Sequence, residues 1–248
     1  MGNPIAEGFM PNIVLINESA GVSDAQIQVM LPAFAEQWNE DLRSVWGVEE
    51  AAFAFSPRTE RPAAGSWWVV FLDDSDQAGA LAYHDLTNDG LPIAKVFVDG
   101  FLADKASISV GASHEICEMA VDPWLNSAYQ DPTGVFWAGE VCDPVEDEQY
   151  GYEIGGVLVT DFVTPSWFGY ARAQGQLDLG DHADTPFQIL PGGYAQRFQG
   201  PKGWSQVTGA KAIRSLRARS AAKGSRRERR ARQAFEPLKR SERLWTAT

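Results

Sequence analysis

The residues with the clearest chemical meaning lie in one stretch, Ser113–Pro123, which reads Ser-His-Glu-Ile-Cys-Glu-Met-Ala-Val-Asp-Pro. It contains the pattern H-E-x-x-E inside a segment that we expect to be helical. His114 and Glu118 are four residues apart, so both side chains leave the same face of a helix, one turn apart. That spacing suits two ligands of one metal ion, as in the H-E-x-x-H pattern.

Glu115 follows the first candidate ligand directly, where it could polarise a metal-bound water and act as the catalytic base. Zinc accepts carboxylate oxygen as well as imidazole nitrogen, so the pattern predicts Zn²⁺. Ca²⁺ is the second choice, because oxygen ligands are numerous. A helix with an acidic polar face would show the same letters without binding a metal.

A second group of metal-ligating residue types follows one short loop downstream, in the segment Gly-Glu-Val-Cys-Asp-Pro-Val-Glu that ends at Glu146. Zinc sites of this class close with a ligand from a loop beyond the helix. We favour Asp143 as the third ligand, with Glu140 as the second choice. Cys142 is either a ligand or a buried thiol. The alternative for this segment is a solvated acidic turn.

Four other residues carry groups that bear on the site. His84 and His182 are candidates for the third ligand, but we favour a structural role for each. Cys117 is expected to pack inward as a small apolar residue. Asp122 is eight residues from His114, about 12 Å along a straight helix, and is expected to form hydrogen bonds at the helix end.

The remaining patterns predict the elements that must position these residues. Apolar runs predict strands at residues 12–17, 51–55, 67–72, 78–83, 93–98, 135–138 and 157–162, with 67–72 in the centre of a sheet. A capping box at Ser23 opens a long amphipathic helix to about Val45, with Gly47 as its stop and Pro32 as a kink or restart. A second helix is expected over residues 106–120, ended by Pro123.

These elements predict an α+β fold with a mixed twisted sheet, a long backing helix and an active-site helix. We expect one metal-binding domain over residues 1–200, with an upper part at 12–122 and a loop-rich lower part at 123–200. A basic tail at 201–248 follows. Residues 1–200 hold seven of the 21 Lys and Arg and 30 of the 33 Asp and Glu, which gives them a net charge of −23. The tail has a net charge of +11.

The overall composition limits the class of protein. An apolar content of 44% and a charged content of 22% are typical of a globular chain. Two cysteines cannot form a disulfide framework. The sequence shows no apolar run of the ~20 residues that a membrane helix needs, and no signal peptide. We therefore expect no membrane contact and a cytoplasmic location, or a virion if the gene belongs to a phage.

The order of strand, long helix, strands, hairpin and His-Glu helix resembles the N-terminal half of the zincin metallopeptidases. The chain is similar, more closely, to a group of uncharacterised bacterial and phage proteins. The shared segments are the Tyr-His-Asp run at 82–85, Ser-His-Glu-x-x-Glu-Met at 113–123, Glu-Val-Cys-Asp at 140–143 and Asp-Phe-Val-Thr-Pro-x-Trp-Phe at 161–168. This resemblance covers about residues 12–195 and implies a zincin-like fold more than an activity.

The chain departs from the zincin pattern at the site itself. Glu118 stands where H-E-x-x-H has its second histidine, and neither the H-x-x-G-x-x-H extension nor a Met-turn is present. An anionic ligand in place of a neutral one lowers the net charge of the site. We expect the ion to be a weaker Lewis acid for that reason.

Two hypotheses follow from these observations. The first, toward which we lean, is a zinc-dependent hydrolase of the peptidase type, active or degenerate, in which Glu115 takes a proton from the water that attacks a peptide carbonyl. The second is a non-catalytic phage or prophage virion protein on the same scaffold, in which the metal stabilises the fold. Its basic segment 211–243 would contact a neighbouring acidic protein or nucleic acid.

Overall fold

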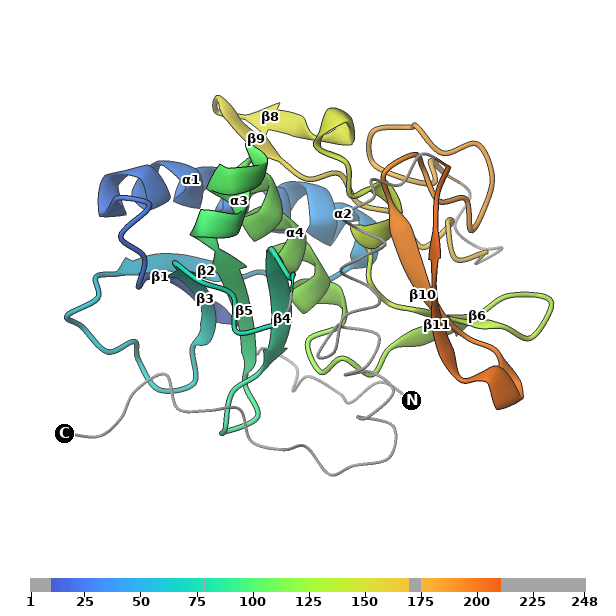
Figure 1. Cartoon of the computed structure of the whole chain (residues 1–248), viewed down its shortest axis with the longest axis horizontal. Helices are drawn as coiled ribbons and strands as arrows, with labels where there is room; N and C mark the ends of the chain where they lie inside the picture. The colour runs from blue at the N-terminus through green and yellow to red at the C-terminus, as the bar shows by residue number, and fades with distance from the viewer. Residues whose placement is uncertain (1–9, 78, 170–174, 211–248) are drawn as a thin grey trace.

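The computed structural model describes residues 10–77, 79–169 and 175–210, and it shows an α+β fold (Figure 1). The residues after 210, which hold most of the basic tail, lie outside the described residues. A five-stranded sheet forms the upper part, in the order β2-β1-β3-β5-β4. The strands are β1 (Asn12–Asn17), β2 (Ala52–Ser56), β3 (Trp67–Leu72), β4 (Ala82–Leu86) and β5 (Pro92–Phe97).

Four strands of this sheet are parallel, and the edge strand β4 runs antiparallel to β5. The apolar strand β3 lies in the centre of the sheet, as its sequence predicts. A turn at Thr87–Gly90 joins β4 to β5, with a backbone hydrogen bond of 2.9 Å from Gly90 N to Thr87 O. The hairpin therefore places β4 at the edge of the sheet.

The long helix predicted between Ser23 and Val45 is present in three consecutive pieces: α1 (Asp24–Glu36), the π-helix η1 (Gln37–Leu42) and α2 (Arg43–Trp46). The capping box at Ser23 is formed, and Gly47 ends the helix in the left-handed conformation with φ 66°. The helix runs without a break through Pro32, and its geometry changes instead at Gln37.

One face of this long helix is buried against the sheet, because its apolar residues recur every three or four positions. Its fully buried members are Ile27, Phe34, Trp38 and Leu42. They join one core with β3 and with the second predicted helix, α4 (Ile108–Val121). In Figure 1 the helices lie together on one side of the sheet.

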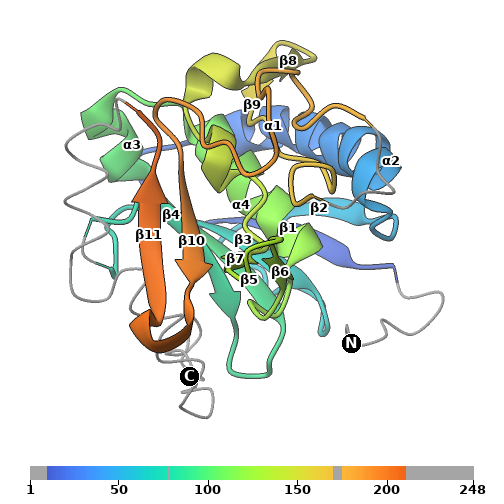
Figure 2. The same cartoon turned by 90° about the vertical axis from the view of Figure 1, so that its right-hand side faces the viewer.

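The lower part consists mainly of loops with short strands. These are β6 (Ala128–Gln130), β7 (Phe136–Ala138), β8 (Tyr152–Ile154), β9 (Val157–Val159), β10 (Tyr194–Phe198) and β11 (Trp204–Thr208), with short 3₁₀ turns at η2 (Asp143–Val145), η3 (Glu148–Tyr150) and η4 (Gly200–Lys202). The hairpin of β10 and β11 crosses one end of the molecule (Figure 2). Within the described residues, no helix has the length and apolar character required to cross a membrane.

Several predicted boundaries were wrong. The strand predicted at 78–83 lies at Ala82–Leu86, so His84 is inside it. The strand predicted at 157–162 ends at Val159. The sequence analysis missed the short helix α3 (Val98–Asp104), because the apolar run of β5 continues into it. It also missed the hairpin of β10 and β11, which extends beyond residue 200.

Candidate metal centre

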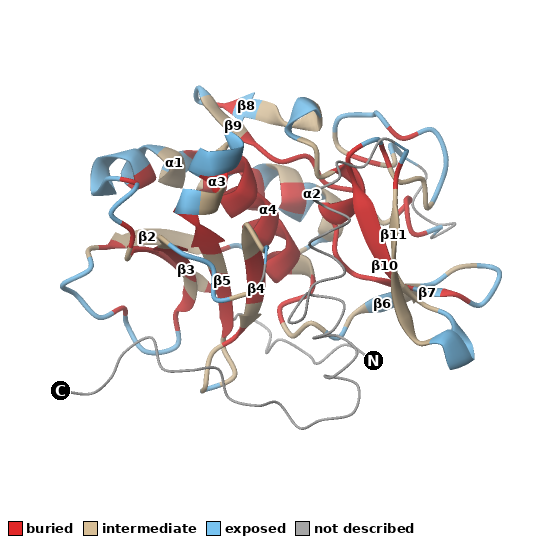
Figure 3. Cartoon of the chain, viewed as in Figure 1, coloured by how far each residue is buried: buried red, intermediate tan, exposed pale blue. Residues whose placement is uncertain are grey.

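Helix α4 is buried along almost its whole length, including its polar residues (Figure 3). Ser107 caps its N-terminus by accepting a hydrogen bond from Val110 N. Near that end Gly111 permits a close approach of α3, because a Cβ there would overlap the Phe101 ring. At the other end Asp122 accepts hydrogen bonds from two backbone N–H groups, of Asn126 and Ser127, which confirms its predicted role. The helix is therefore fixed at both ends.

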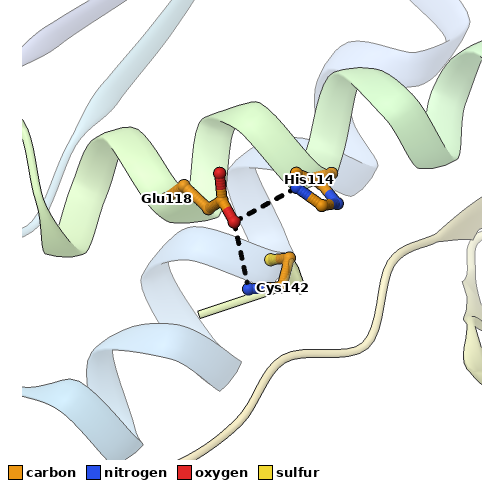
Figure 4. A group of neighbouring side chains, drawn as sticks. All are labelled: His114, Glu118 and Cys142. Carbon is orange, nitrogen blue, oxygen red and sulfur yellow. Dashed lines mark hydrogen bonds and ion pairs between the residues drawn. The ribbon is translucent and has the colours of Figure 1, made fainter. Parts of the chain in front are cut away.

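His114 and Glu118 leave the same side of α4, as their spacing predicts (Figure 4). The distance from His114 Nε2 to Glu118 Oε1 is 3.1 Å. Asp143, the favoured third ligand, has its Oδ1 3.3 Å from the same nitrogen. All three residues are at most 5% exposed. The structure thus places Glu118 and Asp143 each within 3.3 Å of His114 Nε2. Cys142 rather than Asp143 is the residue whose ligand atom lies within 4.8 Å of those of both His114 and Glu118.

Asp143 reaches this position because its loop is held on both sides. Leu190 N donates to Pro144 O at 2.9 Å, and Val163 N donates to Val141 O at 2.8 Å. Gly193 lies so close to η2 that a Cβ on it would overlap the Pro144 carbonyl group. Two other segments of the lower half, around Val163 and around residues 190–193, therefore position one carboxylate.

His84 enters the same cluster from β4, although the sequence analysis favoured a structural role for it. Its Nδ1 lies 3.3 Å from Glu115 Oε2 and 3.6 Å from Glu118 Oε2. Its Nε2 is buried, makes no hydrogen bond among the described residues, and lies 3.8 Å from Glu140 Oε2. The sequence carries no spacing signal for this approach, because β4 and α4 meet only through tertiary packing.

Glu140 and Cys142 occupy different parts of the cluster. Glu140, the second choice for third ligand, lies beside His84, with an ion-pair distance of 3.8 Å. The Cys142 thiol is grouped with His114 and Glu118, their candidate ligand atoms lying within 4.8 Å of one another. The Cys142 backbone N–H also donates to Glu118 Oε1 at 3.4 Å. Asp143 and Cys142 therefore both remain within reach of an ion at His114.

The two imidazoles of the cluster are basic. Burial disfavours the imidazolium of His114, but the charge of Glu118 and the hydrogen bond with Asp143 outweigh burial and raise its pKa well above the usual value. Burial also disfavours the imidazolium of His84, but the neighbouring carboxylates outweigh burial. Those of Glu140, Glu115 and Glu118 raise the pKa of His84. Both rings thus take up protons readily when no metal ion competes for their nitrogen atoms.

The two cysteines are buried and not bonded to each other. Burial raises the pKa of the Cys142 thiol well above its usual value, and the neighbouring Cys117 thiol and the charges of Glu118 and Asp143 add to this effect. A neutral thiol is a poor metal ligand. A metal ion at His114 would oppose this shift, because a coordinating thiol loses its proton, so Cys142 stays a candidate ligand beside Asp143.

A second group of His and Asp side chains lies apart from α4. His182 Nδ1 is 3.1 Å from Asp161 Oδ2 and 2.9 Å from Asp178 Oδ2. The His182 side chain is 35% exposed, whereas both carboxylates are fully buried. His182 therefore does not join His84 and His114.

The donor set at α4 suits a divalent cation. A tetrahedral ion with ligand bonds of about 2.1 Å holds its ligand atoms about 3.4 Å apart. The distances of 3.1 Å and 3.3 Å around His114 Nε2 are close to that spacing. Imidazole nitrogen with carboxylate oxygen is a ligand set that zinc accepts, whereas calcium prefers six or more oxygens.

Comparison with known proteins adds no further information. No protein-family model matches the chain, and neither the curated proteins nor the solved structures contain a match to it. The residues of the site are therefore the basis for assigning a function.

Proposed function

We propose that the protein is a zinc-dependent hydrolase of the peptidase type, built on a zincin-like scaffold. His114, Glu118 and Asp143 hold the ion, and Glu115 is the catalytic base. The observation that carries the proposal is the convergence of these residues, each of them no more than 5% exposed. Buried carboxylates are costly unless a counter-charge stabilises them, and a divalent cation supplies one.

The mixed sheet supports the zincin-like part of the proposal. The antiparallel strand β4 forms one edge, and α4 packs against β4 and β5. An exposed sheet edge can hold an extended peptide by adding it as a further strand. A peptide bound along β4 would lie on the strand that carries His84.

Zinc, when bound, acts as a Lewis acid that polarises a carbonyl group and makes water more acidic. Glu115 accepts the proton that the attacking water loses, since its carboxylate lies one residue from His114 on the same helix. His84 orients Glu115 through the 3.3 Å contact between Nδ1 and Oε2. Burial of the cluster keeps bulk water away from these groups.

The first experiment is elemental analysis of purified protein, followed by hydrolysis assays on a peptide library. We expect Glu115→Gln to lower the hydrolysis rate by about 10²–10⁴-fold, the usual contribution of a general base. The variant should retain the ion at His114. Glu153→Gln, which alters an exposed glutamate on β8, is the matched control. It should change neither the hydrolysis rate nor the amount of bound zinc.

A second candidate function is a structural protein of a phage virion that uses the metal to stabilise the fold. The observation that favours it is the +11 charge of residues 201–248. The same experiment distinguishes the two. Bound zinc without hydrolysis of any peptide would favour the structural role, and absence of bound zinc after reconstitution would refute both metal-dependent proposals.

A further inference from the structure

The Glu118 carboxylate lies between two imidazoles that come from different elements. Its Oε1 is 3.1 Å from His114 Nε2, on the same helix. Its Oε2 is 3.6 Å from His84 Nδ1, on β4. Each oxygen therefore faces a different nitrogen, which is the arrangement of a carboxylate that bridges two cations.

The environment of His84 has the dimensions of a metal site in its own right. Candidate ligand atoms of His84, Glu115 and Glu118 lie within 4.8 Å of one another, and all three residues are buried. The separations from Nδ1, 3.3 Å to Glu115 and 3.6 Å to Glu118, bracket the ~3.4 Å expected between ligands of a tetrahedral ion.

The far side of the His84 ring supports this assignment. Nε2 is buried without a hydrogen bond among the described residues and points toward Glu140, whose Oε2 is 3.8 Å away. Histidines that bind metals usually donate their other ring N–H to a carboxylate, which fixes the tautomer and the ring orientation. At 3.8 Å the contact with Glu140 is an ion-pair contact and not a hydrogen bond, so we assign Glu140 an electrostatic positioning role rather than a ligand role.

The charge of the cluster indicates how many cations it can hold. Glu115, Glu118, Glu140 and Asp143 are each at most 4% exposed, and with neutral imidazoles their charges sum to −4. One divalent cation at His114 together with a protonated His84 leaves a charge of −1 in a buried site, whereas two divalent cations neutralise it. Uncompensated buried charge is unfavourable, so the cluster favours a second cation.

We propose a second divalent-cation site formed by His84 Nδ1, Glu115 Oε2 and Glu118 Oε2, next to the ion at His114 and sharing Glu118 with it. This inference rests on the proposed function and deepens it. Carboxylate-bridged ions lie about 3.5–4 Å apart in two-metal sites. While the second ion is bound, Glu115 Oε2 is a ligand, so the second equivalent should slow hydrolysis that depends on Glu115 as the base.

The test is zinc stoichiometry in wild type, His84→Gln and His114→Gln, measured by elemental analysis after dialysis and by calorimetric titration. Wild type should bind about two zinc ions per chain, as two-metal sites do, and each variant about one. Asp85→Asn is the matched control, because it removes a carboxylate adjacent to His84 on the opposite face of β4, and it should bind as wild type does.

A spectroscopic measurement on wild type keeps the test independent of whether the His84 variant folds. With Mn²⁺ as the probe, a spin-coupled paramagnetic resonance signal should appear at the second equivalent and be absent at the first. A second equivalent that gives only the signal of isolated ions would overturn the inference.

The stoichiometry also separates this inference from the proposed function. One ion that is lost in His114→Gln and kept in His84→Gln would overturn the second site and leave the hydrolase proposal intact. Two ions that are both kept in His84→Gln would place the second ion elsewhere and overturn the inference. No bound ion in wild type would overturn both proposals.

Discussion

Among the described residues, one group of histidine and carboxylate side chains is buried at α4, and another in the lower half combines two buried carboxylates with the partly exposed His182. The two groups are stabilised in different ways. At α4, ion pairs connect each of four carboxylates to an imidazole of His84 or His114, and the Cys142 backbone N–H donates a long hydrogen bond of 3.4 Å to Glu118. In the lower half, the carboxylates of Asp161 and Asp178 accept hydrogen bonds from backbone N–H groups as well as facing His182. The counter-charge in the lower half is thus partly built into the backbone.

The details of the lower group show why it suits a structural role. Asp161 Oδ1 accepts from Phe162 N at 2.7 Å and from Gly180 N at 3.2 Å. Asp178 Oδ1 accepts from Ala183 N at 2.8 Å. Hydrogen bonds of this kind stabilise a carboxylate without a metal. Proximity of histidine and carboxylates is therefore weak evidence for a metal site, and the source of the counter-charge is more informative.

The largest expected difference between the two groups is in stabilisation by zinc. A ligand present at 100 times its Kd stabilises the folded state by about 2.7 kcal/mol. We expect zinc to raise the free energy of unfolding of wild type by about that amount. We expect Glu118→Ala to abolish this stabilisation by zinc. Urea unfolding with and without zinc measures both quantities.

Asp178→Asn is the matched variant in the lower group. It should lower the stability of the metal-free protein and leave the zinc-dependent gain unchanged. A gain that disappears in Asp178→Asn and persists in Glu118→Ala would reverse the assignment of the two groups.

The next effect is a pH dependence with opposite signs in the metal-free and zinc-bound proteins. The pKa values of His84 and His114 are raised in the folded state. Their contribution to the stability of the metal-free protein is therefore fully present below the unfolded pKa of about 6.5, and it is lost as pH rises through the raised values. Zinc needs neutral imidazoles, so its stabilising effect should increase over the same range.

Unfolding curves between pH 6 and pH 9, with zinc and with a chelator, check this expectation. The test uses a variant in which the His and Asp side chains of the lower half no longer titrate. If the stability of this metal-free variant increased over the same pH range, the expectation would be contradicted. The double variant Asp161→Asn/His182→Gln supplies that background, because it removes both groups of the lower half whose pKa values are raised.

A smaller pH effect is expected from Asp161 itself. Burial and the neighbouring Asp178 raise the pKa of Asp161 to about 7. Protonated Asp161 stabilises the fold below its unfolded pKa of about 3.9, and the contribution is lost as pH rises through about 7. Asparagine keeps an N–H donor toward Asp178 at every pH. Asp161→Asn should therefore flatten the stability profile between pH 4 and pH 7, with unchanged zinc content.

The smallest effect separates the two candidates for third ligand at His114. We expect Asp143→Asn to lower zinc affinity by about 10–100-fold or more, the range seen even for residues that only orient metal ligands. Cys142→Ser should lower it by less than that. The cobalt-substituted protein should lack a thiolate-to-metal charge-transfer absorption, and the appearance of that absorption would assign Cys142 as a ligand instead.

The regular elements of the upper part were largely predictable because their signals are local. The capping box at Ser23, the recurring apolar residues from Ile27 to Leu42 and the stop at Gly47 all lie within one helix. The apolar run of β3 likewise indicated a central strand. The lower part was harder to predict, since its strands are short and pair with distant partners, as β10 does with β7.

What the sequence determined by itself was the pair of residues on α4. His114 and Glu118 meet because four residues make about one helical turn, and any folded form that keeps this helix keeps the pair. The expectation of an acidic third residue from a following loop also came from the sequence. Local geometry was sufficient for both.

Only the tertiary structure decided how the rest of the cluster is assembled. His84 lies 30 residues before His114 in the chain, and only the packing of β4 against α4 brings its ring to Glu115 and Glu118. The same packing left His182 in a separate group with Asp161. Side chains from separate elements meet only where the core orients those elements, so residue types alone could not distinguish the two histidines.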